Sequence, residues 1–174
     1  GRAIPSPAPH RGRGAPRAPG PAVTERQPAP RPSASRPSPR PYGPRPLYLG
    51  TYTTGEGGGT GVGLATYDPS SGRVTGTGTL TGIVDPSYLA LHPDARTLYA
   101  VEERDDGAVT AVRLADRRIL GARSTGGAGP CHLSVHPSGR WLLSADYTSG
   151  SVAVHPIADS GALGERTDLV RHSS

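Results

Sequence analysis

Glu103 and His132 are the two side chains in this sequence best suited to acid–base chemistry. Glu103 follows an apolar, strand-like segment at residues 97–102, and His132 opens a later segment of the same kind. A carboxylate and an imidazole can together activate water and pass a proton to a leaving group. We therefore predict His132 and Glu103 as catalytic residues, one as a base and the other as its partner.

A second set of residues is predicted to hold the substrate. Backbone N–H groups in the GGAG segment at residues 126–129 can receive an oxyanion or a phosphate, and Arg104 can contact an anionic group. Tyr147 occupies the repeat position of Glu103 and is expected at the same edge of the fold. The predicted substrate-binding residues are Arg104, Gly127, Gly129 and Tyr147.

Each of these residues also has a structural interpretation. His132 can cap the connection between two repeats, and Glu103 can be a solvated residue in the acidic run at residues 102–106. Arg104 can be a surface charge. The glycines can serve a tight connection, because a lone Gly-rich loop is weak evidence for phosphate binding.

The sequence contains none of the motifs typical of serine hydrolases, zinc sites or nucleotide-binding loops. We find no Gly-x-Ser-x-Gly, no zinc-ligand spacing and no Walker loop. We predict no metal and no cofactor.

The elements that position these residues come from an internal repeat. Residues 86–101 (PSYLALHPDARTLYAV) match residues 130–145 (PCHLSVHPSGRWLLSA) at an offset of 44, which aligns His92 with His136. Such recurrence marks His92 and His136 as turn residues. Each repeat divides into short alternating segments separated by turn residues. The expected strands are 47–52, 62–67 and 74–80, then 88–91, 97–102, 108–114 and 119–124, then 132–135, 141–146, 151–157 and 167–171.

Four antiparallel strands per period of this length predict a β-propeller, an all-β fold of radial blades. The chain then holds about two and three-quarter blades, and the first lacks its innermost strand, which suggests closure by a strand from the far C-terminus. In up-and-down blades the 126–132 connector, residues 102–107 and residues 146–150 share one rim, and His92 and His136 lie on the other.

Composition separates a tail from the repeats. Residues 1–46 hold nine Arg, one acid and fourteen Pro, whereas the rest holds ten Arg and thirteen acids. We expect a disordered Pro/Arg-rich tail at 1–46 and a partial propeller at 47–174, with blades at 47–84, 85–125 and 126–172. The net charge of +5 thus comes from the tail, so we expect no nucleic-acid binding by the folded part.

Two further expectations concern location. Cys131 is the single cysteine, which favours a reducing compartment, and we expect a cytoplasmic protein. The sequence has no apolar run of about 18 residues, so we expect no membrane association.

Five segments resemble the lactonase family of β-propellers. They are LYLGTYT at residues 47–53, DPSYL at 85–89, LYAVEE at 98–103, GGAGPCHLSV at 126–135 and DYTSGSVAV at 146–154. The resemblance covers residues 47–172 and implies a seven-bladed fold, of which this chain would be an N-terminal fragment. The family's best-known activity hydrolyses 6-phosphogluconolactone to 6-phosphogluconate in the pentose phosphate route, without a metal.

The resemblance therefore implies a lactone hydrolase whose partner is a small-molecule lactone. Two alternatives stay open: a carboxymuconate-lactone enzyme of the same family, and a non-catalytic propeller used as a binding platform, since fold does not fix function. A third places the function in the basic tail. We expect the isolated fragment to be inactive, because site residues from later blades are missing.

Overall fold

The computed structural model describes residues 43–172, which form eleven β-strands and one 3-10 turn, η1 (Gly55–Gly57). Residues 1–42, where most of the expected tail falls, lie outside the described part. The strands are β1 (Arg45–Leu49), β2 (Val62–Asp68), β3 (Arg73–Leu80), β4 (Leu89–Leu91), β5 (Thr97–Glu102), β6 (Ala108–Arg113), β7 (Arg118–Ser124), β8 (Pro130–Val135), β9 (Trp141–Asp146), β10 (Ser151–Pro156) and β11 (Asp168–Arg171).

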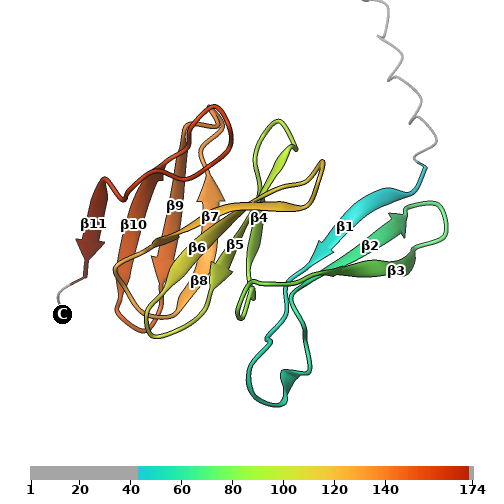
Figure 1. The fold of residues 1–174 in the computed structure, drawn as a ribbon, viewed down its shortest axis with the longest axis horizontal. Coiled ribbons are helices and arrows are strands. Elements are labelled where there is room, and N and C mark those ends of the chain that lie inside the picture. Colours follow the sequence, from blue (N-terminus) through green and yellow to red (C-terminus); the bar gives the residue numbers. More distant parts are fainter. Residues whose placement is uncertain (1–42, 173–174) are drawn as a thin grey trace, which may run out of the picture. The chain divides into compact units, whose positions relative to one another are not determined.

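The strands form three antiparallel sheets, each an up-and-down meander (Figure 1). The first has the order β1-β2-β3, the second β4-β5-β6-β7, and the third β8-β9-β10-β11. Because every strand pairs with its neighbour in sequence, each sheet is one propeller blade, and the first blade has three strands where the others have four. The all-β, incomplete propeller expected from the repeat is confirmed.

Strand positions follow the sequence prediction closely in the second and third blades. The strands predicted at 97–102 and 141–146 are β5 and β9 to the residue, and five of the other six predicted there differ by only one residue at an end. The exception is β8, which starts at Pro130 rather than at residue 132. These strands could be predicted because the apolar alternation is strong and polar turns bound it.

The first strand differs more, since β1 covers Arg45–Leu49 instead of residues 47–52. At its end the chain turns across the second blade: Thr51 N–H donates to the Pro86 carbonyl at 3.1 Å, and a Cβ on Gly50 would lie 2.5 Å from the Ser87 carbonyl oxygen. At its start, Arg45 and Pro46 belong to the strand and not to the expected tail. Proline is tolerated there because β1 is an edge strand in this sheet.

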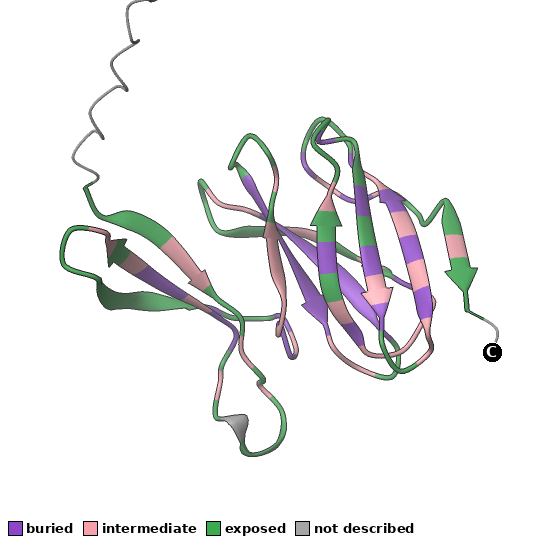
Figure 2. Cartoon of the chain, turned by 180° about the vertical axis from the view of Figure 1, so that it is seen from behind, coloured by how far each residue is buried: buried purple, intermediate pink, exposed green. Residues whose placement is uncertain are grey.

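The blades pack face to face, and β5 sits at the centre with all six residues buried. Its Leu98 and Ala100 join the cluster shared with the first blade, whereas Tyr99 and Val101 join the cluster shared with the third. Figure 2 shows this alternation in the third blade, where buried residues alternate mostly with exposed ones along β9 and with partly buried ones along β10. The alternation of β-strand side chains is therefore used to fill both interfaces.

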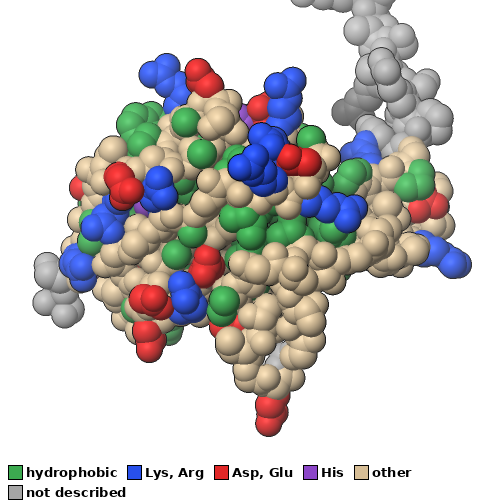
Figure 3. All heavy atoms as spheres, viewed as in Figure 1, with side chains coloured by type: hydrophobic (Ala, Val, Ile, Leu, Met, Phe, Trp, Pro, Cys, Tyr) green, Lys and Arg blue, Asp and Glu red, His purple; other side chains and the backbone are tan. Residues whose placement is uncertain are grey.

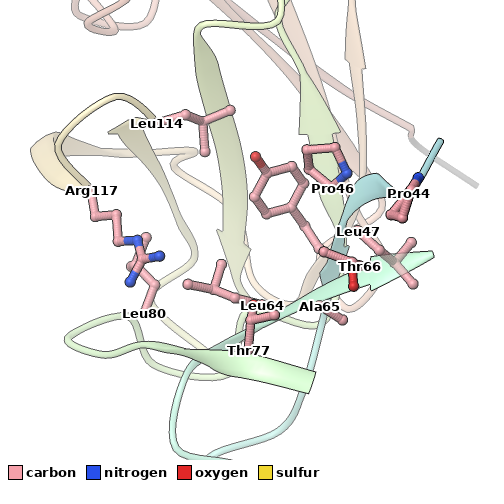
Figure 4. A pocket seen from close by; sticks show the side chains of 11 residues that line it. Pro44, Pro46, Leu47, Leu64, Ala65, Thr66, Thr77, Leu80, Leu114 and Arg117 are labelled. Carbon is pink, nitrogen blue, oxygen red and sulfur yellow. The ribbon is translucent and has the colours of Figure 1, made fainter. Parts of the chain in front are cut away.

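The first blade has an open inner edge, because among residues 43–172 β1 pairs with β2 alone. Two apolar pockets lie beside it. The larger, of about 350 Å³, is lined by side chains such as Leu64, Leu80 and Leu114 (Figure 4). Figure 3 shows hydrophobic side chains at the surface in this region, where the first and second blades meet. Both pockets are lined by residues of the first and second blades and lie where these two blades pack together.

Candidate active site

The predicted site residues gather on one rim of the second and third blades. Antiparallel pairing places the end of β5, the start of β8 and the end of β9 there, and Pro130 pairs directly with Asp146. Two backbone hydrogen bonds join the blades across the rim. Gly107 N–H donates to the Gly127 carbonyl at 3.0 Å, and Gly129 N–H donates to the Arg104 carbonyl at 2.8 Å.

Glu103 lies on this rim and is held by two hydroxyl groups. The Tyr52 hydroxyl, from the loop after β1, donates to Glu103 Oε2 at 2.9 Å, and the Ser87 hydroxyl donates to the same oxygen. The acceptor carboxylate raises the pKa of Tyr52 above its ordinary value. Glu103 is thus fixed by its hydrogen bonds and is not the freely solvated residue of the structural interpretation.

His132 is exposed at the start of β8, directly after a β-bulge. The register shifts between Pro130 and His132, so Cys131 is the extra residue and the bulge sets the direction of the histidine. Its ring packs against Tyr88 with centroids 4.5 Å apart and planes at 41°. Within residues 43–172 neither ring nitrogen has a hydrogen-bond partner, so the imidazole is available to a substrate or a water.

Ser87 and Tyr88 connect the two predicted catalytic residues. Ser87 contacts Glu103, and the next residue, Tyr88, contacts His132. Glu103 and His132 make no hydrogen bond to each other in the described part of the chain. Glu103 and His132 are therefore linked through the two residues that precede β4, Ser87 and Tyr88, and do not contact each other as a base and its partner.

Arg104 is already paired, which favours its structural interpretation. Its guanidinium lies 3.1 Å from Glu102 Oε2 and 3.7 Å from Asp106 Oδ1. Glu102 is buried and also accepts a hydrogen bond from Thr110 at 2.5 Å. A guanidinium that neutralises a buried carboxylate is poorly placed to serve a substrate phosphate as well.

The 126–129 connector does not offer free N–H groups, contrary to the prediction. Its four N–H groups donate in turn to Ser124 Oγ at 3.1 Å, Thr125 Oγ1 at 3.2 Å, Ser149 Oγ at 3.0 Å and the Arg104 carbonyl at 2.8 Å. Gly127 is needed for space, because a Cβ there would lie 2.2 Å from Asp146 Oδ2. Gly129 has φ +65° and is equally crowded by Thr148. These glycines build the connection between blades.

Tyr147 stands at the repeat position of Glu103 and is 84% exposed. Its N–H donates to the Gly129 carbonyl at 2.8 Å, which places it on the same rim as the connector. The corresponding tyrosine of the first blade, Tyr52, reaches the next blade through its hydroxyl. Tyr147 therefore has the position, and the exposure, of a residue facing a further blade or a substrate.

Sequence reasoning missed three residues of this rim: Ser87, Tyr88 and Asp85. Asp85, at φ 45°, accepts hydrogen bonds from the backbone and hydroxyls of Thr53 and Thr54, and so fixes the loop that carries Tyr52. These hydrogen bonds hold the pKa of Asp85 below its usual range. The DPSYL segment at residues 85–89 contains all three residues. It aligns with residues 129–133 of the next repeat, which include the predicted site residues Gly129 and His132, and this alignment could have identified them.

The remaining features of the described residues point to no other site. His92 lies on the opposite rim and bonds the Gly139 carbonyl at 3.0 Å, as a turn residue would. The three pockets found are lined by residues other than the predicted site residues. Residues 43–172 contain no cluster of metal-ligating side chains and no helix long and apolar enough to cross a membrane.

Comparison with known proteins gives one consistent family. Residues 46–174 match the family described as lactonase, 7-bladed beta-propeller. The chain is 28% identical to the 6-phosphogluconolactonase of Bacillus subtilis over 131 residues, which are 72% of this chain and 37% of the relative. It is 39% identical to the 6-phosphogluconolactonase of Pectobacterium carotovorum over 87 residues, 48% of this chain and 25% of that one.

Among solved structures, the periplasmic gluconolactonase of Pseudomonas aeruginosa superposes with a TM-score of 0.65 at 31% identity. The match covers 73% of this chain and 38% of that structure. This chain thus spans at most about two fifths of the length of these relatives.

Proposed function

Because residues 46–174 belong to the lactonase family of seven-bladed β-propellers, we propose that this chain supplies three blades of an enzyme that hydrolyses a sugar-phosphate lactone. The proposed reaction converts 6-phosphogluconolactone to 6-phosphogluconate. The similarity to two 6-phosphogluconolactonases supports the substrate, and the rim that carries His132 and Glu103 supports a hydrolytic site. We call the chain continued by four further blades the seven-bladed protein.

His132 is the proposed general base. Its ring nitrogens are without hydrogen-bond partners among residues 43–172, so one of them can accept a proton from water. The hydroxide equivalent then adds to the lactone carbonyl carbon, the ring C–O bond breaks, and the leaving oxygen takes a proton to become the free hydroxyl group. One water is consumed, and a carboxylic acid and an alcohol are formed.

Glu103 is assigned a positioning role in this proposal. Its Oε2 atom already accepts hydrogen bonds from Tyr52 and Ser87, which fix the carboxylate on the rim. A carboxylate fixed there can accept hydrogen bonds from sugar hydroxyl groups and orient the ring. It can also stabilise the imidazolium that forms when His132 takes a proton.

Two further functions must come from outside the described residues. The connector N–H groups all donate within the chain, and Arg104 is paired with two acids, so neither is well placed to stabilise an oxyanion or bind the phosphate. We assign both functions to the further blades, which face the same rim in a closed ring. The partner is a small molecule, and the lone Cys131 favours a cytoplasmic site of action.

The substrate assignment is tested by comparing two lactones. We expect the seven-bladed protein to hydrolyse 6-phosphogluconolactone above its spontaneous rate, with kcat/KM at least about tenfold higher than for the unphosphorylated lactone, since one charge-assisted contact is worth about 1.5–3 kcal/mol. Preference for the unphosphorylated lactone would overturn the phosphate assignment. Binding of either lactone without turnover would favour the non-catalytic platform.

A further inference from the structure

The face of the third blade that packs on the second carries four buried polar residues, and three of them matter here. Ser144 is 1% exposed, Asp146 2% and His155 0%. They lie on one face because Ser144 and Asp146 alternate along β9, while His155 and Ala153 alternate along β10. The apolar cluster between these blades, which includes Leu142 of the same face, surrounds them.

Among residues 43–172, one polar atom of each of these three residues has no hydrogen-bond partner. These atoms are Ser144 Oγ, Asp146 Oδ1 and His155 Nδ1, all inaccessible to solvent. The opposite atoms are satisfied, since Asp146 Oδ2 accepts from the Ser151 hydroxyl at 3.0 Å and His155 Nε2 bonds the Ser124 carbonyl at 3.1 Å. An unpaired buried polar atom costs about 1–3 kcal/mol, and such atoms in folded proteins usually bind ordered water.

Ser144 lies between the other two. It pairs directly with Ala153, whose short side chain leaves room on this face, and it is two residues from Asp146 on the same strand. His155 is diagonal to it, opposite Leu142. Diagonal neighbours in a sheet lie about 7–8 Å apart at the backbone, so their polar side-chain atoms can be joined through a water instead of by a direct hydrogen bond.

The hydrogen-bonding types also require a donor in these gaps. His155 Nε2 faces a carbonyl oxygen, so it carries the proton and leaves Nδ1 as an acceptor. Asp146 Oδ1 is an acceptor as well when the carboxyl group is ionised. The single hydroxyl hydrogen of Ser144 can serve only one of them, whereas water has two hydrogens to donate. We propose that ordered water occupies a buried site around Ser144 Oγ and donates hydrogen bonds to Asp146 Oδ1 and His155 Nδ1.

Electrostatics favours a neutral ligand here. Burial raises the pKa of Asp146 and lowers the pKa of His155, so the surroundings disfavour charge on both groups. Arg166 and Glu165 are the other charged groups that act on His155. Water adds no charge to the interface, whereas a cation would.

The water site is continuous with the connector that precedes His132. Ala128 N–H donates to Ser149 Oγ at 3.0 Å, the Ser149 and Ser151 hydroxyls bond each other at 2.8 Å, and Ser151 donates to Asp146. This chain of hydrogen bonds ends on Asp146 Oδ2, and the other oxygen of the same carboxyl group, Oδ1, faces the proposed water. Bound water thus completes a buried network that anchors the connector.

The sign of a stability change tests the proposal. In the seven-bladed protein, Ser144→Ala removes a partner of the water and is expected to lower the Tm by about 2–6 °C. The matched control, Ser160→Ala in the exposed loop between β10 and β11, is expected to change the Tm by less than about 1 °C. If the hydroxyl were truly unpaired, its removal would leave the Tm unchanged or raise it, and the proposal would be wrong.

A high-resolution crystal structure of the unmodified protein gives a second, independent readout. Ordered water within hydrogen-bond distance of Ser144 Oγ and of at least one of the two acceptors supports the site. A sodium or potassium ion there, or a vacant space with no solvent density, overturns it. This result does not depend on lactonase activity, so it stands apart from the proposed function.

Discussion

At the scale of single residues, the two predicted catalytic side chains have different surroundings. His132 is exposed with a free imidazole, as a base requires, whereas Glu103 is tied to Tyr52 and Ser87. The sequence placed both on one rim correctly, because strand order alone decides that. It could not show the hydroxyl partners of Glu103, since those depend on how the first blade packs on the second.

The Tyr52–Glu103 contact is testable through the titration of the phenol. The carboxylate raises the pKa of Tyr52, because an anion that accepts the hydroxyl hydrogen opposes its loss. Glu103→Gln removes the negative charge and is expected to lower the Tyr52 pKa toward its ordinary value. The measurement is the ultraviolet absorbance of tyrosinate against pH in the seven-bladed protein.

Tyr52→Phe serves as the control, because the transition that it removes identifies Tyr52 among the tyrosines of the protein. An unchanged transition in Glu103→Gln would show that the contact does not form in solution. In that case Glu103 would return to the solvated residue of the structural interpretation.

At the scale of elements, the connector between the second and third blades is the feature that positions His132. Its N–H groups, its close approach to Asp146 and the bulge at Cys131 together fix where β8 begins. The sequence showed its glycines and left two roles open for them, a tight connection between blades and N–H donors to a substrate. The structure explains them by space: Gly127 lies where a Cβ would meet the side chains of Asp146, Ser149 and Ser151.

Gly127→Ala is therefore expected to destabilise the protein. The added methyl group would lie 2.2–2.5 Å from three polar side-chain oxygens, and such overpacking typically costs about 1–3 kcal/mol. Gly76→Ala in β3 is the matched control, because a Cβ there meets no atom within 4 Å. Urea unfolding of both variants measures the difference. Equal midpoints would contradict the crowded connector.

Most strands could be predicted because the repeat gives each of them twice. Residues 97–102 and 141–146 occupy the same position in successive blades, and both are β-strands to the residue. The first strand, β1, lies outside the two aligned segments at residues 86–101 and 130–145, so the repeat does not define where it begins. Its end at Leu49 depends on the contact of Gly50 with Ser87, which only the packed blades reveal.

At the scale of the whole molecule, the third blade leaves one face uncovered. Trp141 and Leu143 are 39% and 37% exposed, whereas the equivalent Thr97 and Tyr99 of the second blade are 4% and 0% exposed. A few hundred Å² of such exposure forfeits several kcal/mol at ~25 cal/mol per Å², a large part of the roughly 5–15 kcal/mol that stabilises a domain.

The 174-residue chain made alone is accordingly expected to associate or to stay partly unfolded, and to show no lactonase activity. The open edge of β1 adds an unpaired strand for association. Size-exclusion chromatography and a thermal melt check this. A sharp monomer peak with a cooperative melt would show that three blades suffice for a stable fold.

The most direct test of the account compares two histidine variants of the seven-bladed protein. His132 and His136 lie four residues apart, one on the candidate rim and one in the turn on the opposite rim. Loss of a positioned general base typically costs about 10²–10⁴ in rate. We therefore predict that His132→Ala lowers kcat for 6-phosphogluconolactone by about a hundredfold or more, with the fold intact by circular dichroism, while His136→Ala stays within about twofold of the parent. A folded His132→Ala variant with full activity would contradict the assignment of this rim as the active site.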